Sequence, residues 1–274
     1  MTDTIEAVRR HYDAEVQTDT MVSRFTEALE AIESPLTAAK VAGFDQFHVG
    51  GLAATETFAG LLDLGPDDVV LDAGSGLGGP SRHMAETFGC AVHGVDLTPA
   101  YVAIARLLAD ETGLSGRVAY QVGDLTALPF AAGRFDLVYS QHVMMNVRDR
   151  RAAYGELRRV LKAGGRFAFH DVLAADGEPE VVYPTPWAET AASSTLLTEA
   201  DTRAALRASG LVPRLWNDVT AEAIAWFGQI RPPSPQAPTL ATLMGPRFAA
   251  MGANLAGNLR DGRLRLVMAV CDAV

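Results

Sequence analysis

The chain has 274 residues and a net charge of −10, with 33 acidic side chains against 23 Lys and Arg. Its hydrophobic fraction of 49% excludes an intrinsically disordered chain, because disorder requires few apolar residues. The acidic surplus argues against a nucleic acid or an anionic membrane as partner, since both attract basic surfaces. Composition therefore favours a globular protein with a small, diffusible ligand.

Cysteine use and the N-terminal residues bear on location. Cys90 and Cys271 do not have the spacing of a metal or redox motif, and two cysteines cannot form a disulfide framework. The first residues lack the basic and apolar regions of a signal peptide, and no apolar run reaches the ~18 residues of a membrane span. The sequence predicts a cytoplasmic protein with no membrane partner.

Apolar residues at helical spacing predict an N-terminal helical arm from about Asp3 to Leu36, where Pro35 ends the pattern. We expect residues 1–60 to form this arm or cap and residues 61–274 to form the core. Two irregular, proline-containing pieces predict lid insertions in the core, at about 174–197 and 221–262.

From Val69 onward, short β-branched or apolar runs alternate with helical stretches, a pattern typical of βαβ units around a parallel sheet. The runs are 69–71, 91–95, 118–122, 135–139 and 166–169. An amphipathic helix is expected over 197–211 with Thr198 as its N-cap, and a closing strand over 264–273. The fold class is therefore α/β.

A glycine-rich turn follows the first strand, where Gly74, Gly76, Gly78 and Gly79 satisfy both G-x-G-x-G and G-x-G-x-x-G. Such a turn lets the backbone approach a ligand, but its spacing does not separate a dinucleotide site from other nucleoside sites. Asp96 follows Gly74 by 22 residues, at the end of the second strand. A carboxylate there can accept hydrogen bonds from both hydroxyls of a ribose.

Two further carboxylates discriminate between ligands. Asp72 precedes the first glycine, where its charge would oppose a pyrophosphate but would suit a cationic amino-acid group. Asp124 follows the third strand and offers an acceptor for an exocyclic amine, with apolar neighbours that can sandwich a purine. These positions favour a nucleoside ligand with a positive charge over a dinucleotide.

With these motifs in order, the chain resembles the class I S-adenosylmethionine-dependent methyltransferases of the small-molecule branch. The matching pieces are 71–76, 94–97, 123–130, 135–142 and 157–167, and together they cover roughly 69–172. Five ordered motifs are much more specific than one glycine loop. Residues 45–51 are also similar to the segment that sarcosine-, ubiquinone-precursor- and natural-product-type methyltransferases fold over the methionine end of the cofactor.

The resemblance implies a Rossmann-like, doubly wound sheet of seven strands, mostly parallel, with the last strand antiparallel. It implies S-adenosylmethionine as cofactor and S-adenosylhomocysteine as product. The residues that would contact the cofactor are Gln46, His48, Asp72, Gly74, Ser75, Gly76, Asp96, Leu97, Asp124, Leu125 and Gln141. For Gln46 and His48, a purely structural turn is an equal alternative.

The candidate catalytic residues are His142 and His170, since each stands at the carboxyl end of a strand, where ligands bind in open α/β sheets. Both are plausible bases, although His142 can instead orient its neighbours and His170 can cap its strand beside Asp171. Tyr12, Met145 and Trp187 are candidates for the substrate pocket, with core packing as the alternative. No metal-ligand spacing converges, so no metal is predicted, and a homodimer is left open.

Three functional hypotheses stay open at this level. The first is methyl transfer to nitrogen, oxygen or carbon of a small metabolite. The second is an NAD(P)-dependent oxidoreductase, which explains the glycine loop and Asp96 but leaves Asp72, Asp124 and the 157–165 motif unexplained. The third is a cofactor-binding module on the same fold that transfers no methyl group.

Overall fold

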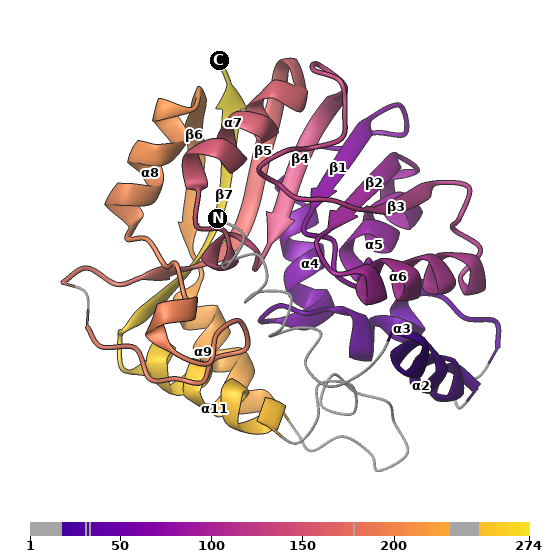
Figure 1. The fold of residues 1–274 in the computed structure, drawn as a ribbon, viewed down its shortest axis with the longest axis horizontal. Coiled ribbons are helices and arrows are strands. Elements are labelled where there is room, and N and C mark those ends of the chain that lie inside the picture. The colour runs from indigo at the N-terminus through magenta and orange to yellow at the C-terminus, as the bar shows by residue number, and fades with distance from the viewer. Residues whose placement is uncertain (1–17, 31, 33, 178, 231–246) are drawn as a thin grey trace.

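The computed structural model describes residues 18–30, 32, 34–177, 179–230 and 247–274 (Figure 1). They form a seven-stranded sheet in the order β3-β2-β1-β4-β5-β7-β6. The strands are β1 (Val69–Ala73), β2 (Ala91–Asp96), β3 (Val118–Val122), β4 (Phe135–Gln141), β5 (Leu161–Ala174), β6 (Leu211–Asp218) and β7 (Leu264–Ala273). Strands β1 to β5 pair in parallel, and β7 runs antiparallel between β5 and β6. The predicted α/β class and the antiparallel last strand are confirmed.

Helices cover both faces of this sheet. They are α2 (Thr18–Glu30), α3 (Ala38–Asp45), α4 (Gly51–Ala59), α5 (Gly79–Phe88), α6 (Pro99–Glu111), α7 (Arg150–Val160), α8 (Glu199–Ala208), α9 (Thr220–Gln229) and α11 (Arg247–Arg260), with short 3-10 turns at Met144–Asn146 and Ala191–Ser193. In the part of the chain described, no helix combines the length and apolar character needed to cross a bilayer.

Side chains of each strand alternate between two buried clusters, one on each face of the sheet. Leu71 of β1 packs with residues of α7 and α8, whereas its neighbour Val70 packs with residues of α4, α5 and α6. Because both faces are covered, the strands are apolar almost throughout, as parallel sheets require. The sheet is thus a rigid platform whose strand ends can hold a site.

The strand predictions are confirmed with one omission. The sequence pattern misses strand β6 because its apolar residues are interrupted by Pro213, where the pairing with β7 shifts register. Proline is tolerated there because β6 is an edge strand. The predicted helix over 197–211 is confirmed in shorter form as α8, whose N-cap Thr198 accepts a hydrogen bond from the Asp201 backbone N–H.

Two groups of helices lie beyond the carboxyl ends of the parallel strands, at the lower side of the view in Figure 1. On one side, α2 and α3 pack against α6 through a cluster that includes Phe25, Phe44 and Ile104. On the other side, α9 and α11 pack with Trp187 and Met145 in a separate cluster. Helix α2 confirms the later part of the predicted arm, while Tyr12 lies outside the described residues.

Candidate active site

A large cavity opens at the carboxyl ends of β1, β2 and β4, between the two groups of helices. Its volume is about 1480 Å³, above the ~300–1,000 Å³ of a typical ligand pocket. The glycine turn and the ends of β2 and β3 form one part of its wall, and α9, α11 and Trp187 form another. The cavity thus has room for two ligands side by side.

The glycine turn after β1 is shaped for close approach. Gly74 has φ +88°, and a Cβ there would lie 2.4 Å from a methyl carbon of Val143, so only glycine fits. The backbone N–H groups of Gly74 and Ser75 both donate to the carbonyl oxygen of Val95, at 2.8 and 3.0 Å. These bonds hold the turn against the end of β2.

Asp96 is fixed at the end of β2 by two backbone N–H groups. Its Oδ2 accepts from Gly76 at 2.8 Å and its Oδ1 accepts from Thr98 at 2.9 Å. Burial raises the pKa of this carboxyl group, and the two backbone hydrogen bonds oppose that rise. Asp96 lines the cavity with Leu97, so its carboxylate can accept further hydrogen bonds from the cavity side.

Asp124 and Leu125 line the cavity beside Asp96, after the end of β3. The Oδ1 atom of Asp124 accepts from the Thr126 backbone N–H at 2.8 Å, which orients the carboxylate. Gln141, at the end of β4, also lines the cavity, and its amide oxygen and nitrogen are buried without a partner among the described residues. Such orphaned polar atoms are costly unless a ligand or water pairs with them.

Asp72 lies behind the cavity wall, and its contact with the cofactor stays a prediction. It is 2% exposed, and its Oδ2 accepts from the hydroxyls of Ser81 at 2.6 Å and Tyr139 at 2.8 Å. Burial raises its pKa to about 7, although the two hydroxyls oppose that rise. The Asp72 side chain points to the α5 face of the sheet. Its hydrogen bonds to Ser81 and Tyr139 therefore link β1 to α5 and to β4.

Gln46 and His48 follow α3 and line the cavity over the glycine turn. Thr55 of α4 donates to the Oε1 atom of Gln46 at 2.7 Å, and its hydroxyl oxygen lies 3.0 Å from the Nε2 atom of His48. The same His48 nitrogen lies 3.0 Å from Gln46 Oε1. The two predicted cofactor residues thus share one buried hydrogen-bond network.

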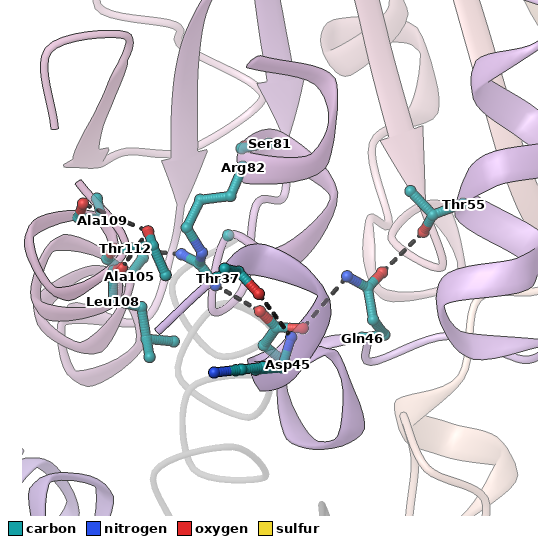
Figure 2. A network of polar contacts seen from close by, with 12 residues as sticks. Thr37, Asp45, Gln46, Thr55, Ser81, Arg82, Ala105, Leu108, Ala109 and Thr112 are labelled. Carbon is teal, nitrogen blue, oxygen red and sulfur yellow. Dashed lines mark hydrogen bonds and ion pairs between the residues drawn. The ribbon is translucent and has the colours of Figure 1, made fainter. Parts of the chain in front are cut away.

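That network continues to a buried ion pair (Figure 2). The Nε2 atom of Gln46 donates to Asp45 Oδ1 at 3.2 Å, and Arg82 of α5 donates to Asp45 Oδ2 at 2.6 Å. Both charged side chains are at most 1% exposed. A Cβ on Gly79 would lie 2.5 Å from Gln46 Nε2 and 2.6 Å from the Asp45 carbonyl oxygen, so the start of α5 fits tightly under this segment.

Three histidine rings meet at the centre of the site. The ring centroids of His142 and His170 are 5.0 Å apart, and that of His48 lies 6.0 and 5.7 Å from them. Burial lowers the pKa of His142 and of His170 well below the usual range, and the neighbouring rings add to this effect. Burial lowers the pKa of His48 to about 4. All three rings are therefore neutral at pH 7.

His142 lies on the cavity wall, whereas His170 is buried behind it at 1% exposure. The backbone of His142 has φ +54°, an uncommon conformation outside glycine that is typical of functional sites. Its N–H donates to the His170 carbonyl oxygen at 2.8 Å. The Nε2 atom of His142 and both ring nitrogens of His170 are buried without a partner in the described part of the chain.

The far wall is aromatic and apolar. Trp187, Trp226, Phe227, Phe248 and Leu255 line it, with Met145 beneath. The indole N–H of Trp187 donates to Ser194 Oγ at 3.0 Å, which fixes that ring. The segments predicted as lids therefore supply this wall.

The structure brings most of the predicted site residues to one cavity. Those on its wall are Gln46, His48, Gly74, Gly76, Asp96, Leu97, Asp124, Leu125, Gln141, His142, Met145 and Trp187. Asp72, Ser75 and His170 lie just behind the wall. No sequence motif marks Tyr101 and Phe248 on the wall or Thr55 and Arg82 behind it, whereas Asp45 and Phe47 lie in the 45–51 segment but are not singled out as site residues.

The three histidine rings are not arranged as a metal centre. Among the residues from 18 onward that the structure describes, no group of three or more His, Cys, Asp or Glu side chains has the arrangement to hold a metal ion. The chemistry open to the three rings themselves is hydrogen bonding and proton transfer.

Comparison with known proteins identifies the central region. Residues 71–169 match the family model described as a methyltransferase domain. The resemblance stated from the motifs is thereby confirmed for this region, and nothing supports the oxidoreductase hypothesis.

Curated relatives extend this similarity. The chain is 33% identical over 140 residues to a phosphoethanolamine N-methyltransferase of Triticum aestivum, covering 51% of this chain and 27% of the relative. It is 33% identical over 168 residues to a sarcosine/dimethylglycine N-methyltransferase of Halorhodospira halochloris, covering 61% of this chain and 60% of that relative. The chain thus spans less than two thirds of either relative.

A solved structure matches almost the whole chain in fold. The geranyl diphosphate C-methyltransferase from Streptomyces coelicolor A3(2) superposes with a TM-score of 0.71 at 21% identity, covering 99% of this chain and 98% of that one. At this identity the likeness establishes the fold and not the substrate. The Rossmann-like methyltransferase fold therefore includes α9, α11 and the helices before β1.

Proposed function

We propose that this protein is an S-adenosylmethionine-dependent methyltransferase that acts on a small molecule. The main support for this proposal is that Asp96, Asp124 and the Gly74 turn line one cavity at the ends of adjacent strands. All three lie within the region that matches a methyltransferase domain. The two curated relatives reported above are methyltransferases of small molecules by name.

The residues present fit the cofactor. Asp96 is held by two backbone N–H groups with acceptor capacity left for the ribose hydroxyls, and Asp124 stands where it can accept from the adenine amine. Leu97 and Leu125 offer apolar contacts for the adenine ring. The Gly74 turn, which has no room for a Cβ, and the unpaired amide of Gln141 would face the methionine part.

When bound, S-adenosylmethionine supplies a methyl group on a positively charged sulfur. The protein then has to align the acceptor with this methyl group and exclude water, and proximity and orientation can contribute ~7–11 kcal/mol. The aromatic wall of α9, α11 and Trp187 excludes water, and the cap formed by Gln46 and His48 covers the glycine turn. His142 is the base available to an acceptor that must lose a proton.

Several further expectations stay predictions. They are the domain boundary at residue 60, the cytoplasmic location, the absence of a nucleic-acid partner, and the possibility of a homodimer. Tyr12 as a substrate residue is a prediction of the same standing. The direct ligand contacts of Gln46, His48 and Gln141 belong to this proposal.

The proposal is tested by calorimetric titration of the purified, ligand-free protein with S-adenosylhomocysteine. We expect saturable binding in the wild type and in Asp63→Ala, an exposed control carboxylate on another surface. Asp96→Ala should lose most of this affinity, because truncation removes the acceptor for the ribose hydroxyls. Equal affinity of Asp96→Ala and wild type, or no binding by the wild type, would contradict the proposal.

A further inference from the structure

The acceptor half of the cavity differs sharply from the cofactor half in the distribution of charge. Asp96 and Asp124 stand at the cofactor end, beside the glycine turn. The opposite wall consists of aromatic and aliphatic side chains, chiefly Trp187, Trp226 and Phe227. An acceptor bound against this wall loses its water and gains apolar contacts instead.

The described charged side chains that line the cavity, other than Asp96 and Asp124, are all exposed to solvent. They are Arg148, Asp149 and Arg260. A phosphate or ammonium group placed deep against the aromatic wall would therefore be buried without a counter-charge from these residues. Burying an unpaired charge is strongly unfavourable, so the described part of this wall favours an uncharged molecule.

Polar side chains nevertheless line the cavity at the end of β4, namely Gln141, His142 and Asn146. The His142 ring lies on the cavity wall, next to Met145 and Gln141 in the lining. His170 and His48 surround it and bring no positive or negative charge, because all three rings are neutral at pH 7. A neutral imidazole with an unprotonated nitrogen accepts a hydrogen bond, and a hydroxyl group is the donor that can also become a nucleophile.

On this basis, and resting on the proposed methyltransferase function, we propose a class of acceptor. The methyl acceptor is an uncharged, largely apolar molecule that presents a hydroxyl group to His142, and the methyl group is transferred to that oxygen.

The reaction balances with the groups present. A bond forms between the hydroxyl oxygen and the methyl carbon, while the bond between that carbon and the sulfur breaks and its electron pair stays on sulfur. The hydroxyl proton passes to the His142 imidazole and later to solvent. An alkylamine acceptor is protonated at pH 7, so it would bring a positive charge to this apolar wall without a counter-charge from the described lining.

The test uses probes that share one apolar ring system and differ in the polar group. The protein saturated with S-adenosylhomocysteine is titrated with 2-naphthol, with the cationic 2-naphthylmethylamine and with the anionic 2-naphthyl phosphate. We expect 2-naphthol to bind at least about tenfold more tightly than either charged probe. With S-adenosylmethionine, mass spectrometry should detect 2-methoxynaphthalene as the product.

His142→Ala should lower the rate of this O-methylation by about 10²–10⁴-fold with unchanged affinity for S-adenosylhomocysteine, which also reports a folded site. His83→Ala is the matched control, since His83 lies on α5 outside the cavity lining and should leave rate and affinity unchanged.

Three results would overturn the acceptor class: tighter binding of 2-naphthyl phosphate or 2-naphthylmethylamine, methylation of the amine, or no binding of 2-naphthol up to about 1 mM. In each of these cases S-adenosylhomocysteine would still bind. Absence of S-adenosylhomocysteine binding would instead contradict the proposed function itself, so the two failures are distinguishable.

Discussion

Two charged side chains that the sequence does not single out, Asp45 and Arg82, hold the cap over the glycine turn. Their ion pair is buried at 2.6 Å and joins the end of α3 to α5. Burial raises the pKa of Asp45 to about 6, while the guanidinium of Arg82 opposes that rise. Such a pair adds little net stability over an apolar one, but removing one partner leaves a buried, uncompensated charge.

Arg82→Met is therefore expected to lower the free energy of unfolding by about 3–5 kcal/mol in urea denaturation. The matched control is Arg263→Met, which breaks the partly exposed pair with Asp261 and should cost less than about 1 kcal/mol. Equal losses in the two variants would show that the buried pair has no special structural role.

The histidine cluster gives the protein a defined dependence on pH. The pKa of His170 is below its usual value of 6.5, mainly because the ring is buried and secondarily because His142 and His48 adjoin it. As pH falls below 6.5, the unfolded chain takes up a proton at this site and the folded chain does not. Stability is therefore constant above that pH and is lost as the pH decreases below it.

Replacing His170 with Gln should remove this contribution. Between pH 7.5 and 5.5, we expect the wild type to lose about 1.4 kcal/mol more unfolding free energy than His170→Gln, measured by urea denaturation at each pH. Phe58→Leu serves as the control, since Phe58 packs against His170 with ring centroids 6.4 Å apart but does not titrate. That variant should keep the wild-type pH dependence, and identical pH dependence in His170→Gln would refute the assignment.

At the scale of elements, the position of α3 over the start of α5 decides how well the cap fits. Gly79 opens α5 and has no room for a Cβ beneath Asp45 and Gln46. Asp96 and Asp124 are positioned by the ends of β2 and β3, whereas Gln46 and His48 of the cap are positioned by the contact between α3 and α5. The cofactor end of the cavity therefore depends on packing between segments more than 30 residues apart in the sequence.

Gly79→Ala should push the cap away from the glycine turn. The expected results are a loss of about 1–3 kcal/mol in the free energy of unfolding, as for other overpacked sites, and weaker binding of S-adenosylhomocysteine by calorimetry. Gly155→Ala in α7 is the control, because no atom lies within 4 Å of its added Cβ and an exposed helical glycine gains about 0.5–1 kcal/mol on replacement. Unchanged binding in Gly79→Ala would contradict this account of the cap.

Sequence patterns predict the helices and strands whose burial follows a regular spacing of apolar residues. They miss features that depend on contacts between segments distant in the sequence. The β-branched runs and the glycine turn predict β1 to β5 and the strand-end positions of Asp96 and Asp124, because their burial follows from local pattern. Strand β6 is not predicted, because Pro213 interrupts its apolar pattern at the edge of the sheet. Residue order also does not reveal that the hydroxyls of Ser81 and Tyr139 lie within hydrogen-bond distance of the Asp72 carboxylate.

At the scale of the whole molecule, the sheet serves as a common frame for two different ligand environments. Parallel strands bring polar strand ends to one edge, and the segments after β5 and β6 add an apolar wall opposite them. The two halves meet at the histidine cluster, at the ends of β4 and β5. The frame is therefore suited to joining a polar methyl donor with an apolar acceptor.

A crystal structure of the protein with bound S-adenosylhomocysteine tests this account most directly. We expect the ribose hydroxyls within hydrogen-bond distance of the Asp96 carboxylate, the adenine between Leu97 and Leu125, and the sulfur facing His142 across the acceptor half of the cavity. Density for the nucleoside outside this cavity, or a ribose that does not contact Asp96, would contradict it.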